Sequence, residues 1–142
     1  MNLWDTRTEY DRPSLDDTHT PERPHQLFEQ WMQAALDAQL PEANAMTLST
    51  LNTSGFPTAR IVLLRAQHED RFTFFTNYHS NKGKELAQNP QCSALFFWPS
   101  LERQIRISGV CTPVSESESG HYFASRPYGV KLARGLRIKV IR

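Results

Sequence analysis

The sequence predicts a mainly β fold, in which a small antiparallel barrel is flanked by helices. The chain has 142 residues, enough for one domain with a real core but not for two. Several segments alternate apolar and polar residues over strand length and are joined by short polar turns. Consecutive strands connected by turns favour antiparallel pairing, and a closed barrel is its simplest form.

Helical patterns lie before, between and after the expected strands. Residues 24–40 place apolar side chains close to a 3.6-residue period, with Pro24 in the first turn. Residues 80–90 predict a short helix with Ser80 as its N-cap. Residues 115–127 combine a capping serine with a glutamate three residues later, which also indicates a helix.

Five segments carry the strand pattern. Alternation is clearest in "AMTLSTLNT", where Met46, Leu48 and Thr50 fall on one face. The expected strands cover residues 45–53, 56–66, 71–77, 91–100 and 103–114.

Charge is distributed unevenly and suggests three regions. All 15 Asp and Glu residues precede residue 126, whereas residues 126–142 hold six of the 16 Lys and Arg residues and no acid. We expect a mobile, polar N-terminal arm over residues 1–22, a barrel domain over residues 23–129 and a basic tail over residues 130–142.

Several classes of protein and site are disfavoured. No apolar run approaches the roughly 20 residues that cross a bilayer, and the acidic N-terminus lacks the apolar core of a signal peptide. Cys92 and Cys111 lie in apolar strand-like runs and are expected to be reduced core thiols. The five histidines are scattered, which disfavours a metal site. We expect a cytoplasmic protein with neither membrane nor nucleic acid as a partner.

Basic and hydroxyl side chains gather around the third strand and the short helix after it. Thr76, Ser80 and Lys82 stand where a strand ends and a helix begins, and the N–H groups of a helix start favour a phosphate. Arg60 and Arg65 are five residues apart on one strand, so they face opposite sides unless a bulge intervenes. Solvated basic residues at strand ends are the alternative interpretation.

Two further groups have both a functional and a plain interpretation. The Gln104 amide both donates and accepts hydrogen bonds, which suits the polar edge of a heterocycle, or it is an exposed strand residue. Tyr122 and Arg126 are four apart on the expected third helix, where they could grip a phosphate or simply form its surface.

Four motifs stand in order along the chain: "ARIVLLR", "FFTNYHSNKGKELAQNP", "ALFFWPSLERQIRISG" and "YFASRP". Together they resemble the pyridoxine/pyridoxamine 5′-phosphate oxidase family. The resemblance covers about residues 7 to 129. It implies a homodimeric split β-barrel that binds flavin mononucleotide (FMN), here incomplete at the C-terminus.

The resemblance implies cofactor contacts from several segments. Lys82 matches a lysine that grips the flavin phosphate, and Asn81 stands where many members have arginine, which would weaken that grip. Phe75 and Thr76 occupy the family's aromatic–threonine pair, and Gln104 matches a glutamine beside the isoalloxazine ring. A further flavin contact is the strand motif Arg60, Ile61, Val62, Leu63, Leu64 and Arg65.

The resemblance also implies substrate contacts and a reaction. Arg65, Tyr122 and Arg126 match residues that hold the substrate phosphate, while Arg7 and Tyr10 resemble an arm that folds over the substrate. The implied reaction moves a hydride from C4′ of pyridoxamine or pyridoxine 5′-phosphate to flavin N5. It yields pyridoxal 5′-phosphate, a form of vitamin B6, and O₂ reoxidises the flavin with release of H₂O₂.

The basic tail departs from the family. Its members continue after "SRP" with a segment resembling "SQIGAWASxQS", whereas this chain reads "YGVKLARGLRIKVIR". With permissible codons, one added A after the Gly129 codon converts the tail to "GSQIGAWASNQSHQ". We therefore predict that the tail is translated out of frame, that the family's C-terminal part is lost and that a barrel edge stays unpaired. A genuine nucleic-acid-binding tail is the alternative, although no aromatic residue follows Tyr128.

Three functional hypotheses follow from these patterns. The first is an FMN-dependent oxidase of vitamin B6 salvage that acts as a homodimer. The second is a split-barrel protein that binds FMN without catalysis, and the third is an inactive remnant of a disrupted oxidase gene.

Overall fold

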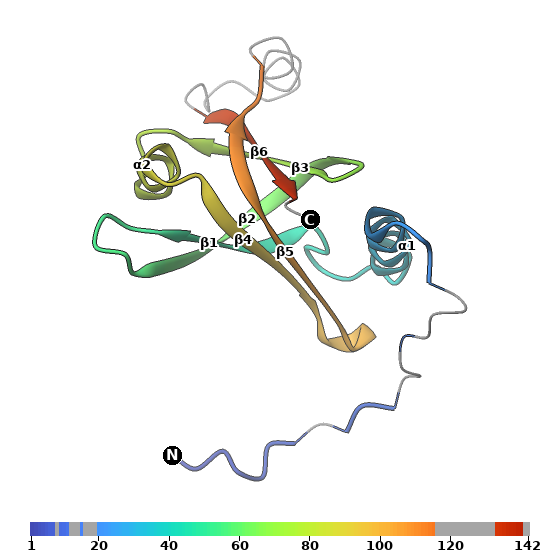
Figure 1. The fold of residues 1–142 in the computed structure, drawn as a ribbon. Helices are drawn as coiled ribbons and strands as arrows, with labels where there is room; N and C mark the ends of the chain where they lie inside the picture. The colour runs from blue at the N-terminus through green and yellow to red at the C-terminus, as the bar shows by residue number, and fades with distance from the viewer. Residues whose placement is uncertain (8, 12–14, 16–19, 116–132, 141–142) are drawn as a thin grey trace.

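The computed structural model describes residues 1–7, 9–11, 15, 20–115 and 133–140 (Figure 1). Two α-helices, six strands and a short 3₁₀ helix occupy these residues. In chain order they are α1 (Pro24–Asp37), β1 (Ala45–Leu51), β2 (Pro57–His68), β3 (Arg71–Asn77), α2 (Asn81–Gln88), β4 (Gln91–Trp98), η1 (Pro99–Leu101), β5 (Arg103–Pro113) and β6 (Ala133–Val140).

The strands form one closed barrel in the order β1-β2-β3-β6-β5-β4, and all neighbours are antiparallel. The mainly β fold with flanking helices is therefore confirmed. The five predicted strands and the first two helices are also present, with ends shifted by up to a few residues. Two strand pairs are short: β1 pairs with β4 only from Thr47 to Ser49, and β2 pairs with β3 only from Leu64 to His68.

Alternate residues of each strand fill the barrel interior. Met46, Leu48 and Thr50 are buried, as the alternation in the sequence predicted. Phe74 and Phe96 are fully buried at the centre.

The two helices cover different parts of the barrel (Figure 1). Phe28 of α1 packs its ring edge-on against Phe72 at 4.9 Å and Phe96 at 5.3 Å, near the start of β3 and the end of β4. The α2 helix instead contacts β1 near its end, where the Thr50 hydroxyl meets Glu85. The start of β3 is therefore covered by α1, whereas the end of β3 leads into α2.

Strand β6 comes from the basic tail and completes the barrel. It pairs with β3 from Ala133 to Lys139 and with β5 from Leu136 to Val140. Leu136 and Ile138 are buried while Lys139 is exposed, which is the alternation of a half-buried strand. A side chain at Gly109 would lie 2.3 Å from the Lys139 carbonyl oxygen, so glycine is needed for β5 to approach β6.

The expectation of an unpaired barrel edge is therefore wrong, because β6 pairs on both sides. The out-of-frame origin of the tail is a separate matter and stays a prediction, which the nucleotide sequence past codon 142 tests. The helix predicted over residues 115–127 lies almost wholly outside the described residues.

Outside the barrel, the described part of the N-terminal arm contains no helix or strand. One backbone contact ties it to the body, where Asp11 N–H donates to Glu102 Oε1 at 3.3 Å. The mobility of this arm stays a prediction. No helix in the described ranges is long and apolar enough to cross a membrane.

The two cysteines are buried on β4 and β5, and both are free thiols. A hydrogen bond between them lowers the pKa of Cys92, whereas the same contact and burial raise the pKa of Cys111. Both residues belong to the core, as the sequence indicated.

Closure by β6 predicts a large effect of core truncation in the tail. We expect Ile138→Ala to lower the free energy of unfolding by about 2–5 kcal/mol, because Ile138 is fully buried between β3 and β5. Urea unfolding followed by circular dichroism measures this. Lys139→Ala, on the exposed side of the same strand, is the control. Equal stability of the two variants would show that the tail does not close the barrel.

Candidate functional site

The candidate site lies where β3 ends and α2 begins. Ser80 caps α2, and its Oγ accepts a hydrogen bond from Gly83 N–H at 3.4 Å. Lys82 Nζ donates to the same oxygen at 3.2 Å. A side chain at Gly83 would lie 2.4 Å from the Tyr78 carbonyl oxygen, so this tight turn requires glycine. The sequence thus places an ammonium group over the first turn of a helix.

Arg60 reaches the same end of the barrel from β2. It lies opposite Leu48 of β1 on the inward face of the strand, and its side chain is partly buried. Its Nη2 donates to Glu85 Oε2 at 2.9 Å and to Thr58 Oγ1 at 2.7 Å. Its Nη1 donates to the Leu48 carbonyl oxygen at 3.3 Å and to the Thr50 hydroxyl. Arg60 is therefore held by β1, by β2 and by α2.

Thr76 supplies an unusual hydroxyl at the end of β3. It follows Phe72 and Phe74 on the inward face and is only 4% exposed. Its Oγ1 has no hydrogen-bond partner among the described residues. Because a buried hydroxyl without a partner costs free energy, this atom is a candidate contact for a polar ligand.

Positive charge exceeds negative charge among Arg60, Lys82 and Glu85. Partial burial and then the positive charge of Arg60 lower the pKa of Lys82. Glu85 is the only acidic side chain in the hydrogen-bonded network described for Arg60. Its pKa is lowered first by the hydrogen bond from Thr50, against burial, and then by Thr58 and Arg60. Two neighbouring cations with one carboxylate, at the barrel end where the Thr76 hydroxyl has no partner among the described residues, suit an anionic ligand.

The "ARIVLLR" strand divides between the two faces of the barrel. Val62 and Leu64 are in the core, whereas Leu63 is partly exposed and Ile61 is 62% exposed on the outer face. The strand register shifts between Leu64 and Ala66, so Arg65 is the extra residue of a β-bulge and is exposed. Arg60 and Arg65 are therefore not brought together.

The other predicted cofactor residues lie around this site or apart from it. Asn81 is exposed at the first position of α2, and Phe75 is partly buried on the opposite face of β3 from Thr76. Gln104 is exposed on β5, opposite Phe97 of β4. Of the predicted residues, the structure thus gathers Arg60, Thr76 and Lys82 at one end of the barrel, and Gln104 lies elsewhere.

The predicted substrate residues are not assembled by the described structure. Arg7 and Tyr10 are exposed in the N-terminal arm. Tyr122 and Arg126 lie outside the described residues.

Sequence reasoning missed Glu85 and its two threonine partners. The sequence places Glu85 in the short helix, three residues after Lys82 and therefore on the same side of α2. Thr50 and Thr58 occupy inward positions at the paired ends of β1 and β2, where an apolar side chain would be usual. Polar residues at inward positions were the available signal.

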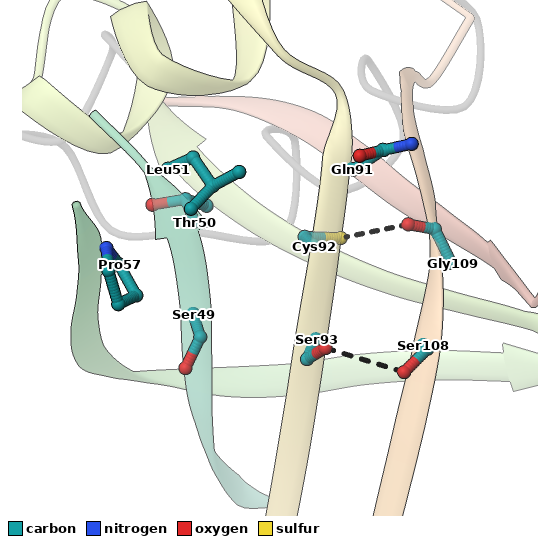
Figure 2. A pocket seen from close by; sticks show the side chains of 9 residues that line it. All are labelled: Ser49, Thr50, Leu51, Pro57, Gln91, Cys92, Ser93, Ser108 and Gly109. Carbon is teal, nitrogen blue, oxygen red and sulfur yellow. Dashed lines mark hydrogen bonds between the residues drawn. The ribbon is translucent and has the colours of Figure 1, made fainter. Parts of the chain in front are cut away.

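Two neighbouring grooves, lined mostly by residues of β1, β4 and β5, lie beside this site. The groove in Figure 2 has a volume of about 370 Å³ and opens where β1 and β4 separate. The adjacent groove, of about 460 Å³, also reaches Arg106. Ser49, Ser93 and Ser108 line both grooves, and the Oγ atoms of Ser93 and Ser108 lie 3.4 Å apart. Neither groove includes Arg60, Thr76 or Lys82, although Thr50, a hydrogen-bond partner of Arg60, lines the groove in Figure 2.

Comparison with known proteins points to one family. Residues 32–138 match the family described as Pyridoxamine 5'-phosphate oxidase. The pyridoxine/pyridoxamine 5′-phosphate oxidase of Burkholderia mallei (strain SAVP1) is 52% identical over 130 residues. That match covers 92% of this chain but 61% of the relative, so the chain spans less than two thirds of the relative's length.

Solved structures with low sequence identity share the fold. PhzG from Burkholderia lata 383, solved with tetrahydrophenazine-1-carboxylic acid, has a TM-score of 0.81 at 21% identity, covering 89% of this chain and 82% of that chain. A pyridoxamine 5′-phosphate oxidase-related, FMN-binding protein from Nostoc punctiforme PCC 73102 has a TM-score of 0.64 at 16% identity, covering 86% and 84%. These two likenesses establish the barrel architecture.

The lowered pKa of Glu85 predicts a loss of stability in acid. Because its folded-state pKa lies below the ordinary value of 4.5, its contribution is complete above about pH 4.5 and is lost as the pH falls through the folded-state pKa. Glu85→Gln, which has no titrating group, should lose less stability over that interval. Urea unfolding at pH 3, 4, 5 and 7 measures the difference. Parallel pH profiles for the two proteins would contradict this prediction.

Proposed function

Because the chain belongs to the pyridoxamine 5′-phosphate oxidase family, we propose that it binds FMN and serves the oxidation of pyridoxamine or pyridoxine 5′-phosphate to pyridoxal 5′-phosphate, with O₂ as acceptor and H₂O₂ as product. The 52% identity to the B. mallei oxidase supports this activity. The observation that carries the proposal is the buried Thr76 hydroxyl, which has no partner among the described residues and lies at the strand end that leads to Lys82.

The residues present fit the phosphate of FMN. A phosphate monoester carries up to two negative charges and several acceptor oxygens, which match two cations and a free hydroxyl. Lys82 and Ser80 at the start of α2 and Thr76 at the end of β3 would hold that phosphate, and Arg60 would add its positive charge from β2. Asn81 is exposed beside Lys82 and would add a polar contact without charge.

Strand β2 offers a second kind of contact to the cofactor. Its residues from Pro57 to Leu63 pair with β1 but not with β3 among the described residues, so one side of this stretch lacks a neighbouring strand. Backbone N–H and C=O groups there would be available to FMN, which explains why an apolar motif, Ile61 to Leu64, serves a polar ligand. Phe75 and Gln104 are the other proposed cofactor contacts.

The chemistry divides between the cofactor and the protein. When bound, FMN supplies the two-electron acceptor that the substrate carbon requires. The protein's task is to fix the two phosphorylated molecules relative to each other, which accounts for several kcal/mol of a barrier. Arg60 faces inward and Arg65 faces outward at the bulge, so we assign Arg60 to the cofactor side and Arg65 to the substrate phosphate. Arg7, Tyr10, Tyr122 and Arg126 are proposed to complete the substrate side.

The outer face of β2, β1, β4 and β5 is proposed to contact a second copy of the chain. Ile61 and Phe97 are 62% and 57% exposed on this face, and Leu63 and Leu95 are partly exposed beside them. Thr47 of β1 lies opposite both Ile61 and Leu95, so these side chains belong to one continuous surface. A second copy would cover this apolar area.

Binding of FMN without turnover is a second candidate function. It would use the same phosphate site, and the exposure of Arg7 and Tyr10 in the N-terminal arm favours it. Turnover of substrate separates the two candidates.

One experiment tests the proposal directly. The purified chain is expected to bind FMN, to form a dimer by sedimentation equilibrium and to convert pyridoxamine 5′-phosphate to pyridoxal 5′-phosphate with release of H₂O₂. Flavin fluorescence, product absorbance and a peroxidase-coupled assay measure these properties. Binding without turnover would support the second candidate, and absence of FMN binding would reject both.

The Thr76→Val substitution tests whether the Thr76 hydroxyl contacts the ligand without lowering the stability of the folded protein. Valine has the shape of threonine without the hydroxyl, so the ligand-free protein should be as stable as before, or more stable by up to about 2 kcal/mol. The FMN dissociation constant should rise about tenfold or more, the loss expected for one hydrogen bond to a charged group.

The matched control for this variant is Thr73→Val, on the same strand. The Thr73 hydroxyl already accepts a hydrogen bond from Arg137 Nε at 3.3 Å. This variant should therefore lose some stability and keep its FMN affinity. Equal FMN affinities for the two variants would argue against Thr76 as a phosphate contact.

A further inference from the structure

Glu85 is a buried carboxylate whose bonds converge on a single oxygen atom. It is 9% exposed on α2, and its Oε2 accepts hydrogen bonds from Thr50 Oγ1 at 2.5 Å, Thr58 Oγ1 at 2.8 Å and Arg60 Nη2 at 2.9 Å. A carboxylate is expensive to bury, so its contacts must compensate for lost hydration. Here one cation and two hydroxyls do so.

The same network fixes the orientation of Arg60. A guanidinium group carries five N–H donors. Four of them, on the two Nη atoms, are directed to the Leu48 carbonyl oxygen, to Thr50, to Thr58 and to Glu85. Of these acceptors, only Glu85 is charged and only Glu85 comes from α2. Removing its oxygen would free one side of the guanidinium group and leave two threonine hydroxyls without that acceptor.

Glu85 also joins the two elements that carry the cations. Lys82 lies three residues before it on α2, so both side chains lie on the same side of the helix. The Arg60–Glu85 ion pair connects this part of α2 to β2. The position of Lys82 relative to Arg60 therefore depends on the reach of the Glu85 side chain.

We propose that Glu85 is a positioning residue of the phosphate site, which holds Arg60 and the first turn of α2 so that both cations act on one phosphate group. This inference rests on the proposed function and deepens it. Two other roles make different predictions. A carboxylate that acts only through its charge would repel the phosphate, and a purely structural residue would affect all flavins equally.

Two substitutions of Glu85 separate the effect of its side-chain length from the effect of its charge. Glu85→Gln keeps an oxygen where Oε2 accepts its three bonds but removes the charge. Glu85→Asp keeps the charge but is one methylene shorter, so its oxygen falls short of the threonines and Arg60. Gln88→Ala, at an exposed position of the same helix, is the matched control. Thr58→Val, which removes one partner of the carboxylate, is a second test should Glu85→Asp fail to fold.

The measurement compares FMN with riboflavin, which lacks the phosphate. Dissociation constants come from quenching of flavin fluorescence, and thermal unfolding in the presence of inorganic phosphate supplies an independent probe. For Glu85→Asp we expect FMN affinity to fall about tenfold or more, with riboflavin affinity within about twofold of wild type. Thr58→Val should change affinity in the same direction. Glu85→Gln and Gln88→Ala should keep the FMN preference of the wild type.

Each alternative outcome has a distinct meaning. An unchanged FMN preference in Glu85→Asp and Thr58→Val, or higher FMN affinity in Glu85→Gln, would overturn the positioning role. Parallel losses for FMN and riboflavin would also overturn it, in favour of a structural role. If the wild type binds no flavin, the proposed function fails, and the effect of Glu85→Asp on stabilisation by inorganic phosphate then decides the inference. If the wild type binds neither flavin nor phosphate, both proposals are rejected.

Discussion

Closure of the barrel is the constraint on which the other features depend. Six strands complete the circuit only because β6 lies between β3 and β5. Without it, the end of β3 that carries Thr76 would have no neighbouring strand there, because β2 pairs with β3 only beyond Leu64. The strand that closes the barrel thus also holds in place the strand end from which the candidate site is built.

The site itself is built where regular pairing stops. β2 separates from β3 before Leu64, and only three residues lie between the end of β3 and the start of α2. Arg60, Lys82 and Glu85 converge there from a strand and a helix, and their charges remain close because hydroxyl groups and burial hold them. A closed barrel in which β2 and β3 pair over only part of their length lets a chain of this size bring charged groups together without giving up its apolar core.

Local patterns predicted much of the fold, and their failures have physical causes. Alternation identified β1 to β5, and Ser80 marked the start of α2, because these signals lie within a few neighbouring residues. Strand β6 was not predicted, because three cations interrupt its sequence and only Leu136, Ile138 and the partly buried Val140 carry the inward pattern. Arg60 and Lys82 were predicted, but Glu85 was not, because its role depends on residues 25 to 35 positions away.

The bulge at Arg65 makes the packing at that position tolerant of substitution but not of deletion. Its side chain points to solvent, so exchange for another long polar residue would disturb little of the packing. Deletion is different, because the extra residue separates two stretches of β2 whose inward faces differ in parity. Shortening the chain there by one residue would turn either Val62 and Leu64 or their successors toward the wrong side. The packing thus accepts other side chains at position 65 but requires that a residue be present there.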